Sequence, residues 1–148
     1  MTDTKKKPWI KYLVLAALVL AAYFINVEVQ TRLGQKAVAE TGLPRHSFQE
    51  ALAKAEAENK PVLANLSAIW CPTCRSLDKT IFVDETVRQR IADSYVYTRI
   101  DFESEEGQAF KERYGVNSFP TLLVLNPQGD ALKQLPITTD PSLFAAQL

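Results

Sequence analysis

Cysteine and histidine are scarce in this chain of 148 residues, which has two cysteines and one histidine. A structural zinc site takes four ligands from cysteine, histidine or carboxylate side chains. The cysteine pair would need His46 and a carboxylate to complete such a site. The composition therefore disfavours zinc, and we expect neither a metal nor a cofactor.

The sequence also lacks an excess of either charge, with 17 basic and 17 acidic residues. The charge is unevenly placed, because Lys5, Lys6, Lys7 and Lys11 stand against Asp3 near the N-terminus and the rest of the chain is slightly acidic. Neither part is basic enough to indicate nucleic-acid binding. No repeat or low-complexity segment is evident, and the length fits one domain with an additional segment.

One long hydrophobic run covers residues 12–27, which carry no charge and are rich in leucine, valine and alanine. With Trp9 and Ile10 the run reaches roughly 20 residues, enough for a helix to cross a bilayer. The lysines that precede it should keep the N-terminus in the cytoplasm. We therefore predict a cytoplasmic basic N-terminus at residues 1–8, a transmembrane signal anchor at 9–29 and a stalk at 30–46.

A cleaved signal peptide is the alternative, because Val19-Leu20-Ala21 resembles a small-residue cleavage site. The apolar run continues beyond that point to Val27, which favours an uncleaved anchor. No cysteine directly follows the segment, so we expect no lipoprotein anchor. The expected location is the bacterial inner membrane with the C-terminal domain in the periplasm, or the soluble periplasm if cleavage occurs.

The remaining residues alternate between helical and strand patterns. Ser47 and Glu50 have the spacing of a capping box before a helix at residues 48–59. Apolar or alternating runs predict strands at residues 62–68, 95–101, 121–125 and 131–135. Helices are expected at residues 71–80, 85–92, 105–114 and 142–148. This order predicts an α/β domain over residues 47–148.

The two cysteines belong to the stretch Trp70-Cys71-Pro72-Thr73-Cys74, between a predicted strand and a predicted helix. Cysteines three residues apart on one helical turn have Cβ atoms roughly 5–6 Å apart, which is close enough for a disulfide. Free N–H groups and the helix dipole stabilise a thiolate at the first position. A redox-active dithiol is the favoured interpretation, and a structural disulfide, which stabilises little across so short a loop, remains an alternative.

The element order, the Trp-Cys-x-x-Cys motif and the step Phe119-Pro120-Thr121 resemble the thioredoxin superfamily over residues 47–148. The resemblance implies a thioredoxin fold, in which a central mixed β-sheet is flanked by helices. Residues 74–82 and 119–129 are similar to the C-terminal domain of the DsbD family of thiol:disulfide interchange proteins.

The resemblance implies roles for the residues that match the motif. Cys71 would be the exposed nucleophile, and Cys74 the buried thiol that resolves the mixed disulfide. Pro120 would be a cis-proline facing the disulfide; an ordinary trans proline is the alternative. The residues expected to contact substrate are Trp70, Pro72, Thr73, Phe119 and Pro120.

One position departs from the pattern of the superfamily. Thioredoxin-like proteins usually carry a buried acid six residues before the first cysteine, and Asn65 stands there in this chain. DsbD-like domains also have an acid one helical turn after the second cysteine, and Asp78 occupies that place. We hypothesise that Asp78 alone tunes the thiols; a solvent-facing helix carboxylate is the alternative.

The function implied is that of an exported, membrane-anchored thiol:disulfide oxidoreductase that reduces substrate disulfides. Its partners would be disulfide-containing exported proteins, including apocytochrome c, and a DsbD-like membrane protein that donates electrons. Two alternatives stay open: a thiol oxidase or isomerase, and a non-catalytic, membrane-tethered assembly or chaperone module.

Overall fold

The structure of the chain is a computed structural model that describes residues 8–148. The predicted cytoplasmic segment 1–8 therefore lies, apart from Pro8, outside the described residues. The helices are α1 (Pro8–Thr41), α2 (Phe48–Glu58), α3 (Pro72–Thr80), α4 (Glu85–Ser94), α5 (Glu105–Tyr114) and α6 (Pro141–Ala145). The strands are β1 (Val62–Ser67), β2 (Val96–Asp101), β3 (Thr121–Leu125) and β4 (Ala131–Leu135).

The strands form one mixed sheet in the order β2-β1-β3-β4. β1 runs parallel to β2, with Val62 opposite Val96, and antiparallel to β3, with Leu63 opposite Val124. β4 pairs antiparallel with β3 at the edge. Every residue of β1 and β3 is buried, as expected for interior strands that helices cover on both sides. The thioredoxin fold expected from the sequence is confirmed.

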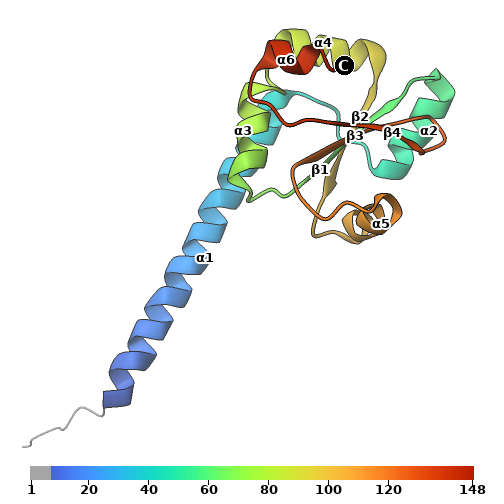
Figure 1. The fold of residues 1–148 in the computed structure, drawn as a ribbon. Coiled ribbons are helices and arrows are strands. Elements are labelled where there is room, and N and C mark those ends of the chain that lie inside the picture. The colour runs from blue at the N-terminus through green and yellow to red at the C-terminus, as the bar shows by residue number, and fades with distance from the viewer. Residues whose placement is uncertain (1–7) are drawn as a thin grey trace, which may run out of the picture.

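Helices cover both faces of the sheet (Figure 1). Leu63, Tyr97 and Leu122 pack on one side with residues of α3, α4 and α6, including Phe144. On the other side, residues such as Leu66 and Ile100 pack against side chains of α2 and α5. One face of α3 is therefore buried against the sheet, which fixes the position of the start of that helix.

Most predicted elements have the expected positions. The capping box before α2 is present: the Ser47 hydroxyl accepts from the Glu50 N–H, and the Glu50 carboxylate accepts from the Ser47 N–H. α6 is shorter than the expected helix at 142–148, because the last residues form a turn. The Leu148 carbonyl there accepts a hydrogen bond from the Tyr95 hydroxyl at 2.6 Å.

α1 is longer than the predicted anchor and contains a segment that is long and apolar enough to cross a membrane. Within the predicted stalk, residues 30–41 continue the helix, and Gly34, Ala37, Val38 and Thr41 are buried. No proline interrupts the helix there, and these small or apolar side chains recur on the face that meets the domain. The helix ends before Gly42, whose φ of 65° is in the left-handed region.

Candidate active site

The cysteine pair lies where β1 leads into α3. Cys71 is the N-cap residue of α3, and Pro72 fills the first turn. The Cys71 Sγ accepts a hydrogen bond from the Cys74 N–H at 3.2 Å. Both cysteines are free thiols in this structure. Negative charge on the Cys71 sulfur is therefore stabilised by a backbone donor and by the positive end of the helix.

The structure differs from the expectation of an exposed Cys71. Cys71 is 6% exposed and Cys74 is 2% exposed. The two thiols pack with Ala68, and Phe102 and Phe119 lie against this cluster. The aromatic side chains reduce the access to Cys71 that its place at a helix start suggested.

The surroundings of Cys74 give its thiol a different role from that of Cys71. Burial raises the pKa of the Cys74 thiol to about 11, and its hydrogen bond with Cys71 adds to this effect. The Ser67 hydroxyl lowers the same pKa by hydrogen bonding, although less strongly. Cys74 is therefore protonated at neutral pH, as expected for a thiol that reacts second.

Three aromatic side chains lie beside the cysteine pair. Trp70 is 36% exposed, and its Nε1 donates to Glu103 Oε2 at 2.9 Å. The Trp70 ring meets Phe119 edge-on at 5.6 Å, and the Phe119 ring lies 4.4 Å from that of Phe102. These rings form an apolar surface beside the sulfur atoms.

The structure brings the remaining predicted contact residues to the same place. The Phe119–Pro120 peptide bond is cis, as expected, and not trans. That Pro120 faces the disulfide stays a prediction. Pro72 and Thr73 are exposed in the first turn of α3. Their role in substrate contact stays a prediction.

Asp78 is buried on the inner face of α3, with 1% exposure, so the alternative of a solvent-facing carboxylate is wrong. Its Oδ1 accepts from Arg99 Nη1 at 2.7 Å. Its Oδ2 is buried without a hydrogen-bond partner among the described residues. Burial raises the pKa of the Asp78 carboxyl, and the Arg99 charge opposes part of that rise.

Arg99 is a functional candidate that the sequence reasoning missed. It lies on β2, and its Nη2 donates to Ser67 Oγ at 2.7 Å. Since Ser67 also lowers the pKa of the Cys74 thiol, the polar contacts that join Asp78, Arg99 and Ser67 extend to the surroundings of Cys74. The available signal was a lone charge inside an otherwise strand-like apolar run. Only the sheet register places that charge beneath the cysteine pair.

Asn65 does not take part in this chain. It lies opposite Arg99 in the register of β1 and β2. Its Nδ2 donates to the Tyr97 hydroxyl at 2.9 Å, and burial raises the pKa of Tyr97 to about 12. At the position that holds an acid in many thioredoxins, this chain therefore has Asn65, which forms a neutral hydrogen-bonded pair with Tyr97.

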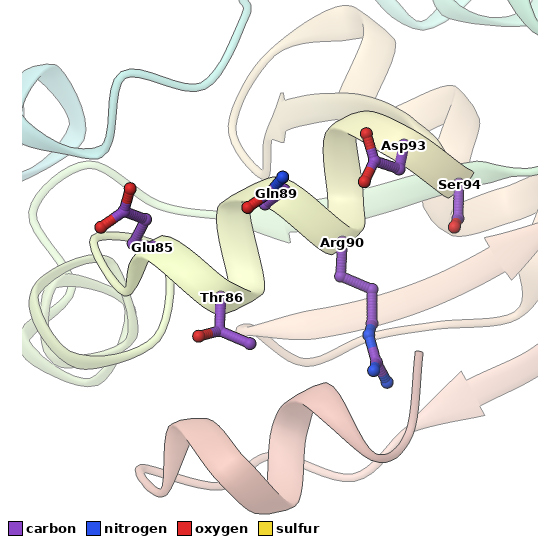
Figure 2. A pocket seen from close by; sticks show the side chains of 6 residues that line it. All are labelled: Glu85, Thr86, Gln89, Arg90, Asp93 and Ser94. Atoms are coloured by element: carbon purple, nitrogen blue, oxygen red, sulfur yellow. The ribbon is translucent and has the colours of Figure 1, made fainter.

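Neither of two other features of the described residues has the chemistry of a redox or metal site. A hollow of about 460 Å³ follows α4, lined by polar residues that include Arg90 (Figure 2). It contains no cysteine, and Arg90 Nη1 donates to the Ala145 carbonyl at 2.6 Å, which fixes α6 on α4. Over residues 8–148, no group of three or more histidine, cysteine or acidic side chains is suited to hold a metal ion.

Comparison with known proteins agrees with this geometry. Residues 43–127 match the family described as thioredoxin-like. The chain belongs to the thioredoxin-like family. It is related to the thiol:disulfide interchange protein DsbD of Yersinia enterocolitica, with 31% identity over 134 residues that cover 85% of this chain and 22% of that protein. The chain thus spans about a fifth of the length of this curated relative.

Two solved structures show the same thioredoxin-like architecture. A putative disulphide-isomerase from Bacteroides thetaiotaomicron is 31% identical, with a TM-score of 0.62 over 72% of this chain and 88% of the other. The reduced C-terminal domain of DsbD from Neisseria meningitidis is 24% identical, with a TM-score of 0.58 over 68% of this chain and 90% of the other. The second likeness concerns the fold alone.

Proposed function

We propose that this protein is a membrane-anchored, exported thiol:disulfide oxidoreductase that reduces substrate disulfides through Cys71 and Cys74. One observation carries the proposal. The Cys71 sulfur caps α3 and accepts the Cys74 N–H, while Cys74 itself is buried and held neutral. Cys71 is therefore placed to attack the substrate first, and Cys74 to react in the second step.

In the first step, the Cys71 thiolate attacks one sulfur of a substrate disulfide. A Cys71–substrate disulfide forms, and the other substrate sulfur leaves as a thiolate that takes a proton from water. In the second step, Cys74 loses its proton and attacks Cys71. The Cys71–Cys74 disulfide forms, the substrate thiol is released, and two electrons have passed from the protein to the substrate.

The surroundings of Cys74 support the second step. Its proton must leave a buried thiol, and the Arg99 guanidinium and Ser67 hydroxyl provide positive charge and a hydrogen bond on the side where the thiolate forms. Asp78 acts through Arg99, because it contacts the guanidinium and its charge holds that side chain in place. We therefore assign Asp78 and Arg99 as positioning residues.

The relatives support the class of reaction, since they are named as thiol:disulfide interchange proteins and as a putative disulphide-isomerase. An oxidising compartment outside the inner membrane would require electrons from across the membrane. A DsbD-like membrane protein is the donor we propose, and exported proteins with disulfides, apocytochrome c among them, are the proposed clients. α1 would anchor the chain, with residues 1–8 in the cytoplasm and the thioredoxin-like domain in the periplasm.

Trapping tests the mechanism directly. Cys74→Ser should accumulate a mixed disulfide between Cys71 and its client, which mass spectrometry would identify, and the matched Cys71→Ser variant should trap nothing. Absence of a trapped species in Cys74→Ser would contradict the assignment. If the variant with both cysteines changed to serine still functions in cells, a non-catalytic assembly or chaperone role is favoured instead.

An isomerase or oxidase is the second candidate, favoured by the 31% identity to the putative disulphide-isomerase. The reduction potential of the cysteine pair distinguishes the two. A value of about −270 mV indicates a reductase of the thioredoxin kind, and a value of about −120 mV indicates an oxidase of the DsbA kind.

A further inference from the structure

α1 makes close contact with the segment that carries the cysteines (Figure 1). At Gly34, an added Cβ atom would lie 1.8 Å from the Ile69 carbonyl oxygen, two residues before Cys71. Only glycine allows the helix to come this near. Four residues earlier on α1, Gln30 Oε1 accepts from Arg75 Nη1 of α3 at 2.6 Å. Two contacts thus hold the long helix against the redox motif.

A cavity of about 340 Å³ lies between α1 and the active-site edge. Tyr23, Asn26, Val27 and Gln30 line it from the helix, and Trp70 and Glu103 line it from the domain. Since the uncharged apolar run of the helix ends at Val27, Trp70 lies at the level where that run ends. Tryptophan and tyrosine side chains favour this level of a membrane.

The height of the redox site follows from helix geometry. Each helical residue adds about 1.5 Å along the axis, so Gly34 lies roughly 10 Å beyond Val27. The Ile69 backbone touches α1 at Gly34, and Trp70 faces residues 23–30. Cys71, the next residue in the chain, is therefore held within roughly 10 Å of the apolar boundary, at or just above the lipid headgroups.

We propose that the contacts of Gly34 and Gln30 make α1 a rigid mount that fixes the height of Cys71, so that the protein selects disulfides displayed at the bilayer surface. This inference rests on the proposed function as a membrane-anchored oxidoreductase. The partner is a membrane-embedded protein whose disulfide lies close to the lipid headgroups. A flexible stalk would instead have let the domain sample many heights and react with disulfides far from the membrane.

The test uses the full chain in phosphatidylcholine vesicles and probes that carry a cysteine–thionitrobenzoate disulfide. On attack by Cys71, the probe releases the coloured thionitrobenzoate anion. Cys74 then displaces the probe thiol as the Cys71–Cys74 disulfide forms, so the released colour reports the first step. The low probe is a single-span helical peptide with the disulfide next to its apolar segment. The high probe carries the disulfide after fourteen further helical residues, roughly 20 Å higher, and a third probe is a soluble peptide.

We expect the low probe to react on the order of tenfold faster than the high probe, because the mount raises its effective concentration. Insertion of seven helix-forming residues between Val27 and Glu28 lifts the domain by about 10 Å and turns it by only about 20°. This variant should reduce the soluble probe at the normal rate and lose its preference for the low probe. Gly34→Leu, which breaks the close contact, should lose the preference without any change in length.

Equal rates with the low and high probes, or a preference that survives the insertion, would overturn the mount while leaving the oxidoreductase function intact, provided that the soluble probe is reduced. Failure to reduce any probe, the soluble one included, would instead remove the proposed function and the mount with it. The soluble probe thus separates the two failures.

Discussion

Arg99→Met should destabilise the protein strongly, because it leaves the Asp78 carboxylate buried without its partner. The Asp78 side chain is 1% exposed and the Arg99 side chain 14%, with 2.7 Å between Oδ1 and Nη1. Removal of one member of a buried ion pair costs about 3–5 kcal/mol. A loss of that size is a large fraction of the usual stability of a domain.

The loss should depend on pH in a direction set by the carboxyl group. Burial already raises the pKa of Asp78, and Arg99 opposes that rise. Without Arg99 the pKa of Asp78 rises further in the folded protein. The folded state then holds a proton that the unfolded state releases, so stability falls as pH increases above the unfolded pKa. We expect a greater loss at pH 8 than at pH 5.

Urea unfolding of the full chain in detergent, followed by tryptophan fluorescence at both pH values, measures this effect. Lys79→Met removes an exposed charge from the same α3 and should change the unfolding free energy by less than about 0.5 kcal/mol. Asp78→Asn combined with Arg99→Met should recover most of the stability, because no buried charge remains. A loss below about 1 kcal/mol for Arg99→Met, or an equal loss at both pH values, would refute the reasoning.

Three further predictions concern the site and the fold. The rate of the second step should rise by about tenfold per pH unit between pH 7 and pH 8, because the raised pKa of Cys74 keeps its thiolate scarce. Stopped-flow release of a peptide thiol from Cys71 measures this rate, and a rate that does not change with pH would contradict the prediction. Trp70→Ala should lower kcat/KM for peptide disulfides and change the unfolding free energy by less than about 2 kcal/mol, since the ring is partly exposed; an unchanged kcat/KM would exclude a substrate contact. Ser47→Ala should cost about 1 kcal/mol in urea unfolding by removing the cap of α2; a cost no larger than that of the exposed control Gln49→Ala would argue against the capping box.

The sequence by itself determined the order of elements and the identity of the reactive pair. Continuous apolar runs predicted β1 and β3 because strands covered on both faces have no polar side. The caps at Ser47 and Gly115 predicted where helices begin and end, since these are local interactions between residues a few positions apart. The short spacing of Cys71 and Cys74 likewise fixed their proximity, because one helical turn joins them.

The tertiary structure alone decided which distant residues meet those sulfur atoms. Arg99 reaches Ser67 and Asp78 only because β2 lies beside β1 in one register, and no local pattern encodes that pairing. The burial of Cys71 likewise depends on aromatic rings brought from far along the chain. The close approach of Gly34 to Ile69 was also decided by the tertiary structure, because burial of small side chains depends on a partner surface that a single segment does not reveal.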